Sequence, residues 1–241
     1  MKLKLTAVFG GLLLLMSGCA VNYTTPAGGV DIGALSDDDI ATLMSLEPAS
    51  EFPAGIAVVR IQASGYSSRT NDSYGGGKFS VVTVRDIEDE EDIKNLIKLP
   101  MVAGIAPLNR VLIQSNLQSI KDLRLSAARL KADMLLVYSV DTSFHVESTS
   151  LGPLSVITLG TLPNHKAYVS ATTSGALIDV RTGYVYGASE ATEREQQRSN
   201  VWSTQEAIDA ARIQAESASF KGFIQDFEVM WKSIVEQYID G

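Results

Sequence analysis

Hydrophobic and polar positions divide the chain into stretches with the period of strands and stretches with the period of helices. Short β-branched or alternating runs bounded by glycine and proline predict strands at residues 55–61, 78–85, 110–113, 134–147, 166–180 and 183–192. The run at 134–140 is almost continuously apolar, which is typical of a central strand covered on both faces. Arg181 and Thr182 predict a tight turn between the last two strands, and residues 193–200 are expected to form a charged loop.

Apolar residues that recur every three or four positions predict helices. The clearest stripe lies within residues 117–131 and consists of Leu117, Ile120, Leu123, Ala127 and Leu130. A second stripe runs from the capping box at residues 203–206 to the end of the chain, as one long helix or two helices joined near Gly222.

Two acidic runs predict the starts of shorter helices. Ser36 and the three aspartates after it cap a helix that carries Ile40, Leu43 and Met44 on one face. Capping explains these aspartates better than a metal site does, because consecutive acids on a helix point in different directions. The run at 86–92 predicts a solvated loop that leads into another helix.

These elements predict an α/β (α+β) fold. We expect a mixed, mostly antiparallel sheet with packed helices and a long C-terminal helix. Residues 64–78, which include three successive glycines, are expected to form a loop between two strands. Residues 99–109 are apolar with two prolines and are expected to form a short crossover.

The N-terminus has the layout of an export signal. Lys2 and Lys4 precede a short apolar run, and Met16-Ser17-Gly18 leads into Cys19, the single cysteine of the chain. Small residues before a lone cysteine resemble a bacterial lipobox, whose cysteine receives lipid after cleavage. We therefore predict a lipoprotein signal peptide at 1–18, a flexible tether from lipidated Cys19 at 19–35, and a single periplasmic domain at 36–241.

The net charge and the cysteine content exclude several kinds of partner and of structural support. Without residues 1–18 the chain carries 18 basic and 28 acidic residues, a net charge of −10. That charge argues against nucleic acid as a partner. With no cysteine after Cys19, no disulfide framework is expected, and no later segment has the length and apolar character of a transmembrane helix. The predicted membrane anchor is therefore palmitate-type acylation, and Ala20 after the cysteine favours the outer membrane over the inner membrane by resemblance to enterobacterial sorting.

Two passages resemble known envelope lipoproteins. Residues 127–138 (AARLKADMLLVY) resemble a helix-to-strand passage of proteins related to the curli secretion channel CsgG, and residues 176–185 (ALIDVRTGYV) are similar to their Thr-Gly ribbon. More closely, residues 127–195 look like the uncharacterised rhombotail (rhombotarget) lipoproteins of bacteria. The resemblance implies a sheet with packed helices as in the TolB N-terminal domain, and scaffolding, binding or secretion work without catalysis.

An uncharged stretch at 148–164 is the candidate contact with a partner or membrane. Its apolar residues are Leu151, Leu154, Val156, Ile157, Leu159 and Leu162. In the channel protein this region corresponds to membrane-inserting hairpins. The stretch is only about long enough for one spanning strand, and Gly152-Pro153 and Gly160 would interrupt it. A partner-binding patch or a loop over the core is the favoured interpretation.

The sequence predicts no catalytic residue, no metal site and no cofactor. It has two histidines, His145 and His165, and none of the common hydrolase or zinc motifs. The favoured hypothesis is a non-enzymatic outer-membrane lipoprotein that faces the periplasm and binds an envelope protein. The alternatives are an oligomeric secretion or pore component that uses 151–162, and a cell-envelope hydrolase that uses one of the histidines.

Overall fold

The computed structural model describes residues 29, 33, 40–68, 72–148, 165–199 and 204–239. Within these ranges the chain forms a mostly antiparallel mixed sheet and four helices. The helices are α2 (Ile40–Met44), α3 (Glu90–Ile97), α4 (Ile120–Arg129) and α6 (Thr204–Ile239). The strands are β1 (Ala54–Ala63), β2 (Gly76–Gly77), β3 (Phe79–Val82), β4 (Val102–Pro107), β5 (Asn116–Leu117), β6 (Met134–Ser148), β7 (His165–Asp179) and β8 (Val185–Ser199).

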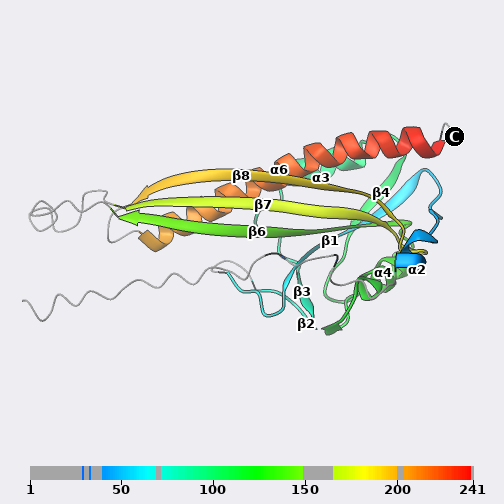
Figure 1. Cartoon of the computed structure of the whole chain (residues 1–241), viewed down its shortest axis with the longest axis horizontal. Helices are drawn as coiled ribbons and strands as arrows, with labels where there is room; N and C mark the ends of the chain where they lie inside the picture. The colour runs from blue at the N-terminus through cyan, green and yellow to red at the C-terminus, as the bar shows by residue number, and fades with distance from the viewer. Residues whose placement is uncertain are drawn as a thin grey trace, which may run out of the picture.

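The main sheet has the order β3-β1-β6-β7-β8, and β4 pairs with β1 beside β3 (Figure 1). β1 runs parallel to β4 and β6, whereas the pairs β1–β3, β6–β7 and β7–β8 are antiparallel. The apolar run at the start of β6 therefore lies in the centre of the sheet, as its sequence predicts.

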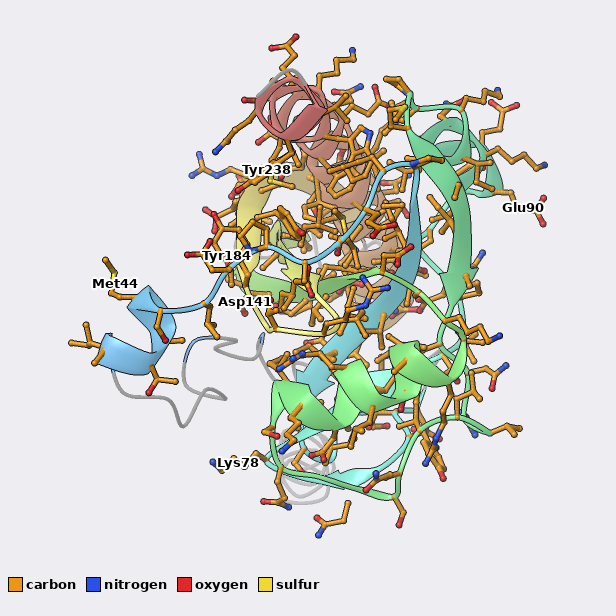
Figure 2. All side chains as sticks on the ribbon, turned by 90° about the vertical axis from the view of Figure 1, so that its right-hand side faces the viewer. Met44, Lys78, Glu90, Asp141, Tyr184 and Tyr238 are labelled. Atoms are coloured by element: carbon orange, nitrogen blue, oxygen red, sulfur yellow. The ribbon has the colours of Figure 1, made fainter. Side chains whose placement is uncertain are left out.

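The sheet separates two hydrophobic cores. On one face the alternate residues Ile56 and Val58 of β1 join Phe223, Phe227 and other aromatic residues of α6. On the opposite face Ala57 and Val59 join Leu123 and Ala127 of α4. Figure 2 shows α6 and α4 on these two sides of the strands. The alternation of side chains along a strand places each set on its own face.

Strands β6, β7 and β8 form a ribbon that continues far beyond β1. Each has 15 residues, about 50 Å of extended chain, whereas β1 pairs with β6 only at Met134–Tyr138. Helix α6 has 36 residues, about 54 Å, and lies along β7 and β8 (Figure 1). We call the end of the ribbon at Ser148, His165 and Ser199 its far end.

Several sequence-based predictions about the elements are wrong. Residues 110–113 form a turn, and the predicted crossover at 99–109 contains strand β4. The charged stretch 193–199 continues β8 because its backbone pairs with β7. The C-terminal prediction is confirmed in its first form, because α6 is one uninterrupted helix through Gly222. Helix α2 exposes the apolar side chains of Ile40 and Met44.

Gly175 in β7 permits the close approach of α6 to the sheet. A Cβ atom at this position would lie 2.8 Å from Phe223 Cζ and 2.8 Å from the carbonyl oxygen of Val137. We expect Gly175→Ala to lower the free energy of unfolding by about 1–3 kcal/mol through overpacking, measured by urea denaturation. The matched control is Gly104→Ala in β4, where nothing lies within 4 Å of the added atom. Equal unfolding midpoints for the two variants would contradict this packing argument.

Candidate functional site

The structure fixes where the predicted contact segment leaves and re-enters the fold. Cys19 and residues 149–164, with all six apolar side chains proposed for contact, lie outside the described residues. The two ends of that segment are described: Ser148 of β6 pairs with His165 of β7 at the far end of the ribbon. The segment therefore starts and finishes at the part of the sheet most distant from β1.

The two histidines are not neighbours in the ribbon. The backbone of His145 pairs with Tyr168, and the backbone of His165 pairs with Ser148. The two positions are therefore three register steps apart, about 10 Å along the strands. No group of three or more metal-ligating side chains that could hold an ion occurs within the described ranges.

One face of the outer ribbon is polar. Alternate residues on this face include Asp141 and Ser143 of β6, Ser170 and Thr172 of β7, and Thr192 of β8, with Thr172 and Thr192 joined by a 2.8 Å hydrogen bond between hydroxyls. The opposite face packs on α6, where Val169 and Ala171 contact Ala211 and Ala215. A hollow of about 420 Å³ lies near the far end, lined by Ser143, Phe144, Tyr168, Val169, Ser170, Arg194 and Glu195.

Charged side chains are buried between β1, the 86–88 loop and α6. The guanidinium of Arg60 in β1 lies 3.1 Å from Asp86 Oδ1, 3.7 Å from Glu88 Oε1 and 3.8 Å from Glu216 Oε2. The Arg60 side chain is only 1% exposed. Asp86 and Glu88 belong to the acidic run predicted to be a solvated loop, and that prediction is wrong for both because each is drawn inward by Arg60.

Helix α6 contributes a second buried arginine to the same cluster. Arg212 donates to Asp209 Oδ1 at 3.0 Å and to Glu216 Oε2 at 2.8 Å. Thr142 of β6 donates its hydroxyl to the other oxygen of Glu216. We call the six charged residues the buried ion network: Arg60, Asp86, Glu88, Asp209, Arg212 and Glu216.

Burial and charge act in opposite directions on the groups of this network. Burial raises the pKa of Glu216 above its usual range, although Arg212 and Arg60 lower it in part. Burial opposes the charge of Arg60, but Glu88, Tyr66 and Glu216 raise its pKa overall. Tyr138 donates to Glu88 at 2.7 Å, and burial beside that carboxylate raises the pKa of Tyr138 well above its usual value. The network therefore works as a structural tie between the sheet and α6.

An acidic hollow of about 350 Å³ opens beside the network. Its lining includes Asp86, Glu88, Asp89 and Asp92 on one side and Lys221 of α6 on the other. Burial, and then the nearby Asp89, raise the pKa of Asp92. Asp89 also caps α3 by accepting from the backbone N–H of Glu91. Each carboxylate has a structural explanation. Asp89 caps α3, Asp86 and Glu88 pair with Arg60, and the charge of Lys221 acts on Asp92.

The two passages that carry the family resemblance meet at the end of the sheet opposite the far end. Asp179 Oδ1 accepts from the backbone N–H groups of Arg181 and Thr182 in the Thr-Gly turn, at 2.8 and 3.0 Å. Asp179 Oδ2 accepts from Ala49 N, Ser50 Oγ and the Tyr186 hydroxyl, at 2.8, 2.8 and 2.9 Å. One fully buried carboxylate thus joins the turn to the segment that enters β1.

Asp133, from the other passage, completes this junction. Its Oδ2 accepts from the backbone N–H of Gly55 at 3.0 Å, and its carbonyl oxygen accepts from the N–H of Val180 at 2.9 Å. Burial alone would raise the pKa of Asp179, but hydrogen bonds from Thr182, Ala49, Ser50 and Tyr186 lower it overall. The two passages therefore form a structural junction.

The end of α6 is tied to the same region by tyrosines. The hydroxyls of Tyr184 and Tyr238 lie 2.9 Å apart, and Tyr186 packs edge-on against both rings. Burial and the hydrogen bond with Tyr184 raise the pKa of Tyr238 to about 12. The C-terminal helix is thereby fixed to the β7–β8 turn.

No protein-family model matches the sequence, and no curated protein matches it. Among solved structures, the fold is similar to a protein of Xanthomonas campestris in the family DUF330, with 12% identity, a TM-score of 0.37, and coverage of 78% of this chain and 90% of that one. It is also similar to lipoprotein GNA1162 of Neisseria meningitidis, with 14% identity, a TM-score of 0.30, and coverage of 66% and 94%. A candidate lipoprotein of Caulobacter crescentus matches with 13% identity, a TM-score of 0.30, and coverage of 47% and 77%.

These similarities are too distant to assign a family or a function, since every TM-score is below 0.5. They do not identify the rhombotail type or the CsgG type that the sequence resembles. No helix within the described ranges is both long and apolar enough to cross a bilayer.

Sequence reasoning missed the buried ion network, although the sequence contains a signal for it. Arg212 and Glu216 lie on the same helical stripe as Phe223 and Phe227. Arg60 likewise follows Ile56 and Val58 at the strand period. Charged residues that occupy positions of an apolar stripe indicate a buried polar cluster.

Proposed function

We propose that this chain is a non-enzymatic outer-membrane lipoprotein of the rhombotail type, anchored through lipid on Cys19 and facing the periplasm. Its function on this proposal is to bind or position an envelope protein. The lipobox-like residues before Cys19 and the polar stretch after it support the anchor. The far end of the ribbon is the proposed contact with the partner.

The projection of the ribbon is the observation that carries this proposal. β6 continues ten residues past Tyr138, its last pair with β1, which is about 33 Å of strand. The uncharged segment 149–164 is joined to the end of that extension, and its six large apolar residues form a sequence patch with no charge to keep it in water. Because the segment is attached at the far end of the ribbon, we propose that its apolar residues meet another molecule there.

The described part of the ribbon favours a protein partner over insertion into lipid. A lipid-facing strand needs apolar side chains at alternate positions. Along the ribbon the face turned away from α6 carries Asp141, Ser143, Ser170 and Thr172, and the other face is covered by α6. Only residues 149–164 would remain for insertion, which is about the length of one spanning strand with its ends.

Labelling with a palmitate analogue tests the anchor. We expect wild-type chains to incorporate label and to fractionate with the outer membrane, and Cys19→Ala chains to carry no label and leave that fraction. The matched control is Ser17→Ala, which keeps the small residue and the acceptor cysteine. Label on the Cys19→Ala chain, or none on wild type, would overturn the proposed anchoring.

Cross-linking mass spectrometry on the labelled wild type tests the partner. We expect reproducible cross-links between the far end of the ribbon and one envelope protein. Cross-links confined to the α4 side of the body would overturn the assignment of the far end. Protection of 149–164 by lipid alone, in vesicles without protein, would favour the pore alternative.

A further inference from the structure

Strand β8 leaves a long open edge on the described sheet. It is the last strand in the order β3-β1-β6-β7-β8, and its only partner in that sheet is β7. Alternate residues Ala188, Glu190, Thr192 and Arg194 are exposed, whereas Ser189 and Ala191 face α6. An exposed edge of this length is a template for pairing with another strand.

The alternation of backbone hydrogen bonds along the strands shows which residues of β8 direct their N–H and C=O groups toward the open edge. In an antiparallel sheet, residues along a strand bond alternately to the strand on either side. The N–H of Val180 bonds to Asp133 before β6, and the N–H of Asp179 bonds to Tyr184 before β8. Odd-numbered residues of β7 therefore bond to β8. Beyond the register shift between Ile178 and Leu177, their partners in β8, such as Ser189 and Ala191, are also odd.

The even-numbered residues of β8 consequently direct their backbone N–H and C=O groups outward. These are Ala188, Glu190, Thr192 and Arg194, the same residues whose side chains are exposed on the face away from α6. The edge thus combines backbone groups that pair with no other strand of the described chain with one acidic and one basic side chain four residues apart.

We propose that two copies of this chain pair edge to edge through β8, antiparallel, about a two-fold axis at Thr192. In this register Thr192 lies opposite Thr192 of the second copy, and Glu190 lies opposite Arg194 in both directions. The two sheets join into one continuous sheet across the dimer. The contact is isologous, as expected for a closed dimer.

Charge selects this register over its neighbours. A pairing centred on Glu190 places two glutamates opposite each other, and one centred on Arg194 places two arginines opposite each other. A pairing centred on Glu193 also places two glutamates opposite each other, on the face of the sheet that packs against α6. Like charges directly opposite each other disfavour strand pairing, whereas opposite charges favour it. Centring on Ala191 opposes no two charged residues among 188–195, whereas centring on Thr192 forms two opposite-charge pairs and no like-charge pair there.

This inference does not depend on the proposed lipid anchor or on the partner at the far end. A lipid anchor would strengthen the pairing because confinement to one membrane raises the effective concentration of the second copy. Measurements on the full chain, with and without Cys19→Ala, therefore separate failure of the edge contact from failure of the anchor.

Cysteine cross-linking tests the register. Opposed residues in a hydrogen-bonded antiparallel pair have Cα atoms about 5.5 Å apart, which is within the range for a disulfide. We expect Thr192→Cys to form a covalent dimer under mild oxidation, above the background that wild-type Cys19 gives. The control Ala188→Cys places the two cysteines about 27 Å apart along the strands and is expected to stay at background. Equal cross-linking of both variants, or none of Thr192→Cys, would overturn the register.

Charge reversal tests the contact without new cysteines. We expect Glu190→Arg and Arg194→Glu each to shift the full chain in detergent from dimer to monomer by at least about tenfold in dissociation constant, measured by sedimentation velocity. The double variant, and an equimolar mixture of the two single variants, restore opposite charges and are expected to restore dimers. Glu193→Arg, on the other face of the same strand, is the matched control with no expected effect.

A monomeric wild type at all concentrations would overturn the proposal. So would dimers that persist in both single variants, or a double variant that remains monomeric. Circular dichroism on each variant shows whether the monomers keep the fold. Capture of a different protein at the β8 edge, with no self-association, would also overturn it.

Discussion

Asp179→Ala is expected to lower the free energy of unfolding by about 3–5 kcal/mol, because five donors would lose one buried acceptor. Two of these donors are backbone N–H groups of the β7–β8 turn, and the others come from the segment before β1 and from Tyr186. Urea denaturation followed by circular dichroism measures the change. The matched control is Asp226→Ala, an exposed acid on α6, for which we expect a change within about 0.5 kcal/mol.

The Asp179 contribution should also depend on pH in a defined direction. Hydrogen bonds hold the pKa of Asp179 below its usual range in the folded chain. A carboxyl with a lowered folded pKa stabilises the protein above its unfolded pKa, about 3.9, and the stabilisation is lost as the pH falls through the folded pKa. The difference in stability between wild type and Asp179→Asn should therefore shrink on acidification below about pH 4. A difference that grows on acidification would contradict the assignment of a charged Asp179.

Arg60→Met is expected to lower the free energy of unfolding by about 3–5 kcal/mol. The change removes the ion pairs that Arg60 makes with Asp86 Oδ1 at 3.1 Å and with Glu88 Oε1 at 3.7 Å, and it takes away a guanidinium that is only 1% exposed. Denaturant midpoints measure this change in the free energy of unfolding. The control is Lys121→Met, on the exposed face of α4.

A double variant shows whether the effect comes from unpaired charge. Arg60→Met combined with Glu88→Gln removes one cation and one anion, and we expect it to be less destabilised than the sum of the two single variants. Arg60 Nε and Gln62 Oε1 are buried without hydrogen-bond partners in the described structure, so the network carries a cost even when intact. Strict additivity would show that the groups of the network act independently.

The central architecture could be predicted from local patterns. The continuous apolar run of β6 and the three-to-four-residue stripe of aromatic residues on α6 each indicate their own burial, and the Thr-Gly pair indicates the turn between β7 and β8. The extension of β8 through residues 193–199 could not be predicted in this way. Its charged residues look like a loop, and only pairing with β7 makes them a strand.

The other wrong predictions concern β4 and the acidic run 86–92, whose structures depend on contacts with distant parts of the chain. β4 contains a glycine and ends at a proline, both of which weaken a strand signal, yet it lies parallel to β1 at the edge of the main sheet. The acidic run 86–92 looks uniformly solvated because the partner of Asp86 and Glu88 is Arg60, 26 and 28 positions earlier. A charge pair across that separation leaves no local trace in the sequence.

The lack of charge in 149–164 predicts a contact segment, and the structure adds the point at which this segment is attached. Sequence alone could not show that 149–164 is carried at the end of a 15-residue ribbon, because strand length depends on register with β7. On the proposed function, this attachment point places the predicted contact at the far end of the ribbon.

Site-specific photo-cross-linking in living cells tests the proposed contact most directly. A photoreactive residue at Leu154 should give one discrete adduct with an envelope protein, and the adduct should disappear in the Cys19→Ala background. The same residue at Val111, which is 90% exposed beside the opposite part of the body, should give none. An adduct from Val111 alone, or no protein adduct from Leu154 in anchored chains, would contradict the account.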